Sequence, residues 1–591
     1  MLLGKALAAR RQHGGARLQR ASLSCVRCSS QAATAVVLVS RTALRLDDNP
    51  ALLAAASSGA AVTLALCADS LPASAAPALA ALQTVVPGLR VLRGEPGPAV
   101  AALASELGAA TVYACAEPES VAAEELAGVA AALASSGVSV QVCLLQHWAA
   151  EPASDNWREH ERLRGPPLPP QPAPTWVSAP VAAAPTAEVL QTEEGSLGAL
   201  NAYLSETPSP LLEAAAAADA LRAGTSFQVL FGGAIALGLL SPRRIAAAAA
   251  EALDALLDES SRAPAWRIAA GAALARRARQ AKEAAERSAF HTALALAPPT
   301  SSQVELPPGA VRRWWRWRGA LLPYVHLPGP AGAPALMLVH GFGAYGEHWR
   351  RNLALSDSAS VFAPTMPGFG RSEKAALPYS QSLWTDCLAD FIREVVKGPT
   401  AVAGNSIGGF MSAELASRHP ELVTALVLVN SAGPLRGLGQ PEAPPAPRTP
   451  PPALVVNALT TGLLFFLERS VASTLRRCYP VRPDNSDGLE PEIFRAACDS
   501  GAAAVFASAF YLPPPTALDA LVRRFGGPTL VLQGARDPLN DAPSRAERIG
   551  AFCSNAQVVL LEGGHCPHDE VPEEWNAAVR SLLASRAAVA R

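Results

Sequence analysis

Apolar positions in the first part of the chain come in short continuous runs rather than in alternation with polar ones. Between about residues 35 and 146, runs such as AVVLVS, AVTLALCA and TVYACA are separated by alanine-rich stretches of helical character. Strands that are apolar on both faces, each followed by a helix, are typical of a parallel sheet covered on both sides. We therefore predict an open, Rossmann-type α/β domain at residues 33–150.

The middle of the chain carries no strand pattern. Residues 164–180 are rich in proline, which is incompatible with regular helix or strand, and they predict a semi-rigid linker placed at residues 151–195. Residues 196–300 then follow a helical pattern that is interrupted by glycines and a Ser-Pro pair. We predict a separate helical region there.

A third pattern begins near residue 307 and continues to the end of the chain. A hairpin pattern at residues 311–328 is followed by apolar runs with helical stretches between them. Residues 434–522 interrupt this series with prolines and apolar helical stretches but carry no strand signal. The predicted fold is a second α/β domain at residues 307–591, with a helical cap inserted at about 434–522.

Composition and charge narrow the possible partners. A chain of 591 residues with 50% hydrophobic residues can form several buried cores. Its 49 Lys and Arg balance 50 Asp and Glu, so it lacks the positive charge that nucleic-acid binding requires. Trp and Arg alternate at Trp314–Arg318, which would suit stacked bases and phosphates. At the start of a sheet, this alternation instead indicates a strand with one packed and one solvated face. We predict no nucleic-acid partner.

The N-terminus has the composition of a targeting segment. Residues 1–32 contain Arg, Ser and Ala but no acidic residue, and the first acidic residue is Asp47. This composition predicts an organelle transit peptide, for the chloroplast first and the mitochondrion second; a disordered tail is the alternative. The apolar runs Val229–Leu240 and Val455–Leu467 are shorter than the roughly 20 residues that span a bilayer, so we predict no transmembrane segment.

The cysteines give no metal motif. The chain has 10 cysteines, and only Cys25 and Cys28 have CxxC spacing, with no second pair to complete a zinc site. Scattered cysteines suit a reducing compartment. We predict no metal and no cofactor.

Candidate chemistry begins with Ser406, which lies in the sequence Gly-Asn-Ser-Ile-Gly-Gly. An apolar run precedes this segment and a helical stretch follows it. Glycines around the serine let a strand turn sharply into a helix without a Cβ clash, which holds the serine exposed. We predict that Ser406 is a nucleophile.

An acid and a base follow in chain order, each after a predicted strand. Asp537 follows TLVLQGA, and His565 follows VVLLEGG. A serine hydroxyl needs an imidazole to accept its proton and a carboxylate to fix the imidazole tautomer. The alternatives are that Asp537 merely forms a turn before a proline and that His568, rather than His565, is the base. We predict the triad Ser406, Asp537 and His565.

These segments carry a family resemblance. In order, HGFGAYGEHWRRN, MPGFGRSEK, GNSIGG, QGARDP and GGHCPHDEVPEEWN resemble the signature blocks of the α/β-hydrolase-1 family, over about residues 311–585. GNSIGG and PGFGRS are similar to chloroplast hydrolases that include pheophytinase-like esterases. The resemblance implies an oxyanion hole formed by the N–H groups of Phe342 and Ile407. Serine at position 406 argues against the dehalogenase and epoxide-hydrolase branches; ester, thioester, lactone and C–C bond hydrolysis remain open.

The N-terminal domain resembles a different family. VVLVSRTALRLDDNPAL resembles the opening of photolyases and cryptochromes, and LGLLSPRRI resembles the first helical part of their flavin domain. The matching positions are Arg41, Leu44, Arg45, Asp48 and Asn49, while Ala43 replaces the expected acid. The chain then enters the hydrolase part and has no counterpart of the long helical domain that encloses FAD. The resemblance implies a degenerate photolyase-like domain with a truncated helical remnant.

We therefore predict a plastid serine hydrolase that cleaves a carboxylic ester or related acyl bond through an acyl-enzyme, with an apolar small-molecule ester as its substrate. The photolyase-like domain would serve as a regulatory or scaffolding partner, a fusion typical of plants and algae. One alternative is a flavin-dependent blue-light receptor or photolyase-related protein with a passenger hydrolase, and another is a non-catalytic binding protein. The pattern change near residue 307 further predicts that a chain starting near Ser301 folds alone. Substrate identity and oligomeric state stay open.

Overall fold

The computed structural model describes residues 33–149, 155–174, 191–205, 226–260, 265–297, 304–437, 453–481 and 488–589. The predicted transit peptide and the Cys25–Cys28 pair lie outside the described residues, as does much of the predicted linker.

The N-terminal domain is a five-stranded parallel sheet of order β3-β2-β1-β4-β5, which confirms the predicted Rossmann-type class. Its strands are β1 (Thr34–Leu38), β2 (Ala61–Cys67), β3 (Arg90–Leu92), β4 (Ala109–Cys115) and β5 (Ser139–Cys143). Its helices are α1 (Pro50–Ser57), α2 (Ala76–Val85), α3 (Pro96–Leu107) and α4 (Ser120–Ala134). The central strand β1 is buried along nearly all of its length, as its continuous apolar run requires.

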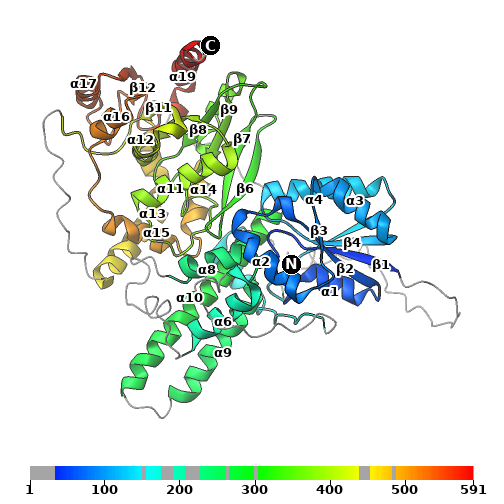
Figure 1. Ribbon diagram of the computed structural model, residues 1–591. Helices are drawn as coiled ribbons and strands as arrows, with labels where there is room; N and C mark the ends of the chain where they lie inside the picture. The colour runs from blue at the N-terminus through cyan, green and yellow to red at the C-terminus, as the bar shows by residue number, and fades with distance from the viewer. Residues whose placement is uncertain are drawn as a thin grey trace, which may run out of the picture.

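The helical region packs against this domain. Its helices are α6 (Glu193–Leu204), α8 (Phe227–Ala236), α9 (Pro242–Ser260) and α10 (Ala265–Leu296). A further helix, α5 (Trp157–Leu163), lies within the residues predicted as a linker. The long helices α9 and α10 lie side by side and project away from both α/β domains (Figure 1). Apolar residues of α6, α8, α9 and α10 share one core with β1, β2 and α1.

The two stretches that resemble photolyases are bound to each other. The buried Asp48 carboxylate accepts hydrogen bonds from Ser241 Oγ (2.6 Å) and Arg243 (2.7 Å) at the start of α9. Arg45 donates to the Gly238 carbonyl oxygen (2.9 Å) in the preceding turn. Arg45 and Asp48 thus link the sheet to the helices, whereas Arg41 pairs with Glu119 inside the N-terminal domain (2.6 Å).

The C-terminal domain is an eight-stranded sheet of order β13-β12-β11-β10-β8-β9-β7-β6, an α/β-hydrolase fold. Its strands are β6 (Val311–Trp317), β7 (Ala320–Leu327), β8 (Ala335–Val339), β9 (Ser360–Pro364), β10 (Thr400–Asn405), β11 (Val423–Val429), β12 (Thr529–Gly534) and β13 (Ala556–Leu561). The hairpin β6–β7 and the β7–β9 pair are antiparallel, and the other pairs are parallel. Helices α11 (Gln381–Phe391), α12 (Ile407–Arg418), α17 (Ala542–Phe552) and α19 (Pro572–Val589) belong to this domain.

Helices are inserted between β11 and β12, where the sequence predicts a cap. They are α13 (Ala453–Cys478), α14 (Leu489–Ala497), α15 (Ala502–Ser508) and α16 (Leu518–Phe525). The last of them, α16, packs against α12 of the hydrolase domain and is therefore not part of the cap. The helices α13, α14 and α15 contact one another and form the cap proper.

No single described helix combines the length and apolar composition needed to cross a membrane, although the bent pair Leu489–Ala497 and Ala502–Tyr511 meets both criteria together. Within the same described ranges, no group of three or more His, Cys, Asp or Glu residues is arranged to hold a metal ion.

The two α/β domains touch through the β6–β7 hairpin. Its packed face buries Trp315 and Trp317, as the alternation predicts. The strand also contacts the N-terminal domain: at its outer edge the Trp314 N–H donates to Ser120 Oγ at the start of α4 (2.8 Å), and Arg313, on the same face as the two tryptophans, pairs with Glu124 on α4. The tryptophan–arginine segment is therefore a docking surface for the N-terminal domain.

Candidate active site

Ser406 occupies a sharp turn between β10 and α12. Its backbone has φ 55° and ψ −120°, a region that side chains with a Cβ rarely adopt. The Ser406 N–H donates to the Val429 carbonyl oxygen (2.9 Å), and its own carbonyl accepts from the Ala432 N–H (2.8 Å). Bonds to the neighbouring strand β11 thus hold the strained turn, which presents the half-buried serine side chain.

Three glycines allow the strand and helix to approach each other at this turn. A Cβ on Gly404 would lie 2.3 Å from the Gly408 oxygen, and one on Gly408 would lie 2.3 Å from the His340 oxygen. A Cβ on Gly409 would lie 2.8 Å from the Gly404 oxygen. None of these glycines has a positive φ; Ser406 has it instead. These positions therefore require glycine because the strand, the helix and the loop after β8 pack too closely for a Cβ, and not because the backbone needs a positive φ.

Asp537 and His565 are brought together from the loops after β12 and β13. The His565 Nδ1 lies 3.1 Å from each carboxylate oxygen of Asp537. The carboxylate also accepts from the Leu539 N–H (2.9 Å) and from Asn540 Nδ2 (3.0 Å). Burial alone would raise the pKa of Asp537, but these hydrogen bonds outweigh burial and lower the pKa below 3.8. An ionised carboxylate accepts only, so it places the imidazole proton on Nδ1 and leaves Nε2 able to accept.

The neighbour of Ser406 ties the serine turn to the histidine loop. Asn405 Nδ2 donates to the His565 carbonyl oxygen (3.0 Å) and to the Val429 oxygen (3.2 Å). Among the described residues, Ser406 Oγ forms no hydrogen bond with the His565 ring. Such contacts in ligand-free enzymes often tighten only when substrate binds.

The loop after β8 passes directly over the serine. A Cβ on Gly341 would lie 3.3 Å from the Ser406 Cβ. The buried His340 ring fixes this loop: its Nδ1 bonds with the Gly341 oxygen (2.8 Å), and its Nε2 accepts from the Met366 N–H (2.9 Å). Burial lowers the pKa of His340 to about 4, so the ring is neutral near pH 7. Phe342 follows on this loop with its side chain 44% exposed.

Ile407 is the first residue of α12, directly after Ser406. The N–H groups of the first helical turn have no acceptor within the helix, and the helix dipole favours negative charge there. Ile407 and the loop of Phe342 thus lie at the carboxyl-terminal edge of the parallel strands. Ser406, Asp537 and His565 follow their strands at the same edge.

His568, the alternative base, and Asp541, the acidic residue nearest to Asp537 in sequence, have other roles. His568 is fully buried and packs against Trp349 with 4.0 Å between ring centroids and a tilt of 35° between the rings. Burial lowers the pKa of His568 well below 6.5, as expected of a core histidine. Asp541 caps α17 by accepting from the Ser544 N–H (3.3 Å). Neither side chain takes the place of His565 or Asp537 in the contact described above.

The sequence reasoning missed a buried polar chain behind the histidine loop. The Tyr479 hydroxyl donates to Asp569 (2.8 Å) and hydrogen-bonds with His348 Nε2 (2.6 Å). Arg350 pairs with the same carboxylate (3.0 Å). Because Tyr479 directly follows α13, this chain ties the cap to the loop that carries His565. Two adjacent acidic residues after His568 could have indicated a buried polar cluster, but the partners of Asp569 lie far away in the sequence.

An aromatic wall lies beside the serine turn. The Phe342 ring contacts Phe369 edge-on (5.4 Å between centroids) and Phe506 of α15 in the same manner (5.5 Å). This wall joins the loop after β8, the loop after β9 and the cap. Such a surface suits an apolar substrate group.

Comparison with known protein families finds a match in each half of the chain. Residues 336–578 match the model of the alpha/beta hydrolase family, and residues 36–153 match that of DNA photolyase. The matching regions coincide with the two α/β domains. They confirm both resemblances found in the sequence.

Curated relatives are similar to the hydrolase part. The chloroplastic pheophytinase of Arabidopsis thaliana is 25% identical over 297 residues, covering 42% of this chain and 61% of that protein. Lipase LipV of Mycobacterium tuberculosis is 33% identical over 114 residues, covering 19% and 43%. The chain thus spans less than two thirds of the length of each of these two relatives. The 2-hydroxymuconate semialdehyde hydrolase of Pseudomonas putida is 29% identical over 270 residues, covering 43% and 88%.

Among solved structures, the enol-lactonase from Burkholderia xenovorans LB400 is 20% identical with a TM-score of 0.38, covering 46% of this chain and 99% of that chain. A thermophilic esterase from Thermogutta terrifontis is 22% identical with a TM-score of 0.35, covering 45% and 94%.

Proposed function

Because the chain joins an alpha/beta hydrolase domain at residues 336–578 to a DNA photolyase domain at residues 36–153, we propose that it is a serine hydrolase acting on a carboxylic ester or a related acyl bond. The observation that carries the proposal is the His565–Asp537 contact of 3.1 Å beside a serine held in a strained turn. These are the parts that acyl transfer to a serine needs.

The mechanism follows from these contacts. Ser406 Oγ attacks the acyl carbonyl while His565 Nε2 accepts its proton, and Asp537 stabilises the imidazolium. The N–H groups of Phe342 and Ile407 bind the oxyanion, each contributing roughly 3–4 kcal/mol to transition-state stabilisation. His565 then protonates the leaving alcohol, which departs and leaves an acyl-enzyme. Water, activated by the same histidine, hydrolyses this intermediate and restores the serine.

The aromatic wall supports an apolar acyl or alcohol group as the substrate class. The exposed ring of Phe342 and the half-buried ring of Phe506 contact each other next to the proposed oxyanion donor, and the buried Phe369 packs against Phe342. The relative named as chloroplastic and the acid-free N-terminus support a plastid location.

We propose a structural role for the photolyase-like domain. The photolyase match ends at residue 153, and Arg45 and Asp48 of the resemblance bond to the turn after α8 and to the start of α9. The purified protein should therefore be colourless. Stoichiometric FAD and a yellow colour would instead support the alternative of a flavin photoreceptor with a passenger hydrolase.

The direct test is labelling of the full chain with a fluorophosphonate probe, followed by p-nitrophenyl esters of increasing acyl length. The wild-type protein should be labelled and should hydrolyse these esters, and Ser406→Ala should lose both properties while keeping its thermal unfolding transition. Residual catalysis from the oxyanion hole and binding, about 10³–10⁴-fold over water, lies below most assays. Labelling that persists in Ser406→Ala would refute the nucleophile assignment.

A further inference from the structure

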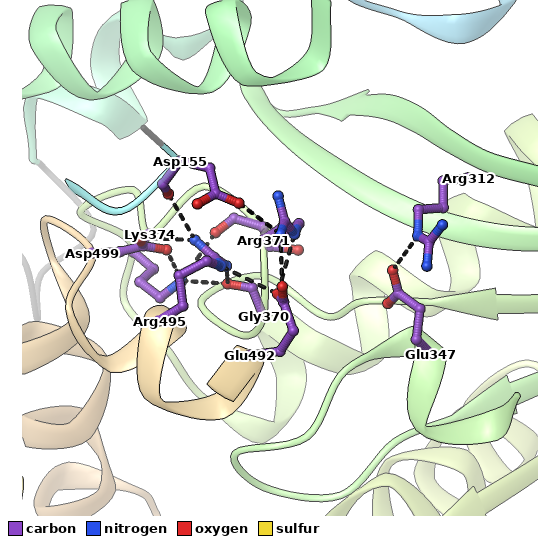
Figure 2. A network of polar contacts seen from close by, with 10 residues as sticks. Asp155, Arg312, Glu347, Gly370, Arg371, Lys374, Glu492, Arg495 and Asp499 are labelled. Atoms are coloured by element: carbon purple, nitrogen blue, oxygen red, sulfur yellow. Dashed lines mark hydrogen bonds and ion pairs between the residues drawn. The ribbon is translucent and has the colours of Figure 1, made fainter. Parts of the chain in front are cut away.

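Six charged side chains from three separate parts of the chain meet in one ion-pair network (Figure 2). One comes from the N-terminal half, two from the loop after β9, and three from the cap and the turn after α14. They are Asp155; Arg371 and Lys374; and Glu492, Arg495 and Asp499.

Arg371 and Arg495 are the centres of this network. Arg371 pairs with Asp155 (2.8 Å) and with Glu492 (2.7 Å). Arg495 pairs with Glu492 (3.2 Å) and Asp499 (3.2 Å), and the Asp155 carbonyl oxygen accepts from it at 3.4 Å. The network thus contains three positively charged side chains and three carboxylates, so its charges balance. Loss of one anion leaves a positive charge without full compensation, which is costly where water is excluded.

The network fixes the backbone of the loop after β9. The Gly370 carbonyl oxygen accepts from Arg495 (3.0 Å) and from Lys374 Nζ (2.8 Å). Lys374 pairs in turn with Asp499 (2.7 Å), and the side chains of both are almost wholly buried. A Cβ on Gly501 would lie 2.3 Å from the Lys374 oxygen, so the cap rests directly on this loop.

This loop leads to the proposed oxyanion hole. Phe369 directly precedes Gly370, and its ring contacts both His340 (5.4 Å) and Phe342 (5.4 Å) edge-on. On the cap side, Phe506 contacts Phe342. The positions of the loop and the cap therefore set the shape of the aromatic wall.

Asp155 lies directly before helix α5, which packs against helix α10. Asn156 caps α5 by accepting from two of its N–H groups, and Trp157 packs edge-on against Phe290 of α10 (5.1 Å). The next residue of α10, His291, is fully buried and interacts electrostatically with Asp499, Lys374 and Arg495. Burial lowers the pKa of His291 to about 3, so it adds no charge to the network near pH 7.

We propose that Asp155 is a specificity-determining positioning residue of the hydrolase, through which the N-terminal half holds the loop after β9 and the cap in the arrangement that binds a long or bulky acyl group. This inference rests on the proposed ester hydrolysis. Asp155 does not touch the reacting atoms; it acts through Arg371 and Arg495. The N-terminal half thereby holds the substrate-binding wall of the hydrolase domain in place.

The test is Asp155→Asn in the full chain, which removes the charge and keeps the shape. We expect KM for p-nitrophenyl laurate to rise about threefold to tenfold, the size expected for one partly exposed charge-assisted hydrogen bond. The kcat for laurate and both constants for p-nitrophenyl acetate should stay unchanged, because the acetyl group has too little apolar surface for the wall to contribute to its binding. Hydrogen exchange of residues 366–374 and 489–497 should become faster.

Asp69→Asn is the matched control. Its carboxylate pairs with Arg93 at the same distance of 2.8 Å but belongs wholly to the N-terminal domain. Asp155→Glu keeps the charge and should retain most of the laurate selectivity. Asp155→Asn behaving like Asp69→Asn in both readouts would overturn the proposal, as would an equal loss on both esters. If the wild type cleaves no ester, the proposed function fails by itself; unchanged hydrogen exchange in Asp155→Asn then overturns the positioning role separately.

Discussion

At the scale of single residues, Ser406 shows how the turn stores strain. A non-glycine residue at positive φ costs about 1–3 kcal/mol, which the surrounding contacts must offset. Hydrogen bonds to Val429 and Ala432 and the close packing of Gly404 against Gly408 supply this offset. The serine is thus positioned before any substrate arrives, as catalysis by orientation requires.

The acid of the proposed triad is testable by a pair of substitutions. Asp537→Asn should lower kcat by roughly 10⁴ because the amide no longer fixes the His565 tautomer. Asp541→Asn should leave kcat unchanged, because this side chain only caps α17 and asparagine caps equally well. Steady-state kinetics on p-nitrophenyl acetate compares the two variants. The reverse ranking would show that Asp541 is the acid.

The order Ser406, Asp537 and His565, each after a predicted strand, was sufficient to select these residues, and the structure brings Asp537 and His565 into contact. The residues that support them could not be selected in the same way. Tyr479 has no local pattern, and it meets Asp569 and His348 only because the cap folds back onto the histidine loop. Partners joined by tertiary contact alone leave no periodic signal in a sequence.

At the scale of elements, the residue pattern of strand β6 predicts which side chains are buried but not the contact of the strand with the N-terminal domain. Burial of Trp315 and Trp317 followed from the alternation, and their Nε1 groups find carboxylate acceptors in Glu394 (2.9 Å) and Asp390 (3.0 Å). The opposite face carries arginine, which the sequence assigns to solvent. The strand's outer edge and Arg313, which lies on the tryptophan face, instead meet α4 of the N-terminal domain. A polar docking surface between domains has the same composition as an exposed one.

Helix α8 offers a direct test of the contact between the halves. A Cβ on Gly232 would lie 2.5 Å from the Arg318 carbonyl oxygen in the β6–β7 turn, whereas one on Gly233 would meet nothing within 4 Å. Gly232→Ala should therefore lower the Tm, since overpacking costs about 1–3 kcal/mol. Gly233→Ala should leave the Tm unchanged or raise it slightly, because alanine favours helix by about 1 kcal/mol. Equal Tm values for the two variants, measured by calorimetry, would show that α8 does not press on the hairpin.

At the scale of the whole molecule, the sequence gives two domains correctly but not their relationship. A proline-rich segment and a change of pattern near residue 307 predict two independent modules. The structure instead shows α8 against the β6–β7 turn, α10 beside the cap network and α4 against β6 (Figure 1). These contacts are polar or close backbone packing and come from distant segments, so neither composition nor periodicity reveals them. They oppose the expectation that the hydrolase part is self-sufficient.

A truncation decides between these two views of the molecule. A chain starting at Ser301 keeps the eight-stranded sheet and the residues of the proposed triad but loses Asp155, α8 and α10. It exposes the hairpin face that contacts the N-terminal domain, and it leaves Arg371 with Glu492 as its only remaining ion-pair partner among the described residues. We expect a lower Tm, a tendency to aggregate during size-exclusion chromatography, and loss of preference for p-nitrophenyl laurate over the acetate. Activity on the acetate should survive in the soluble fraction, because Ser406, Asp537 and His565 lie entirely in the retained part. A truncated protein that equals the full chain in Tm and in selectivity would show that the halves are independent, and that the contacts between them neither stabilise the hydrolase nor shape its site.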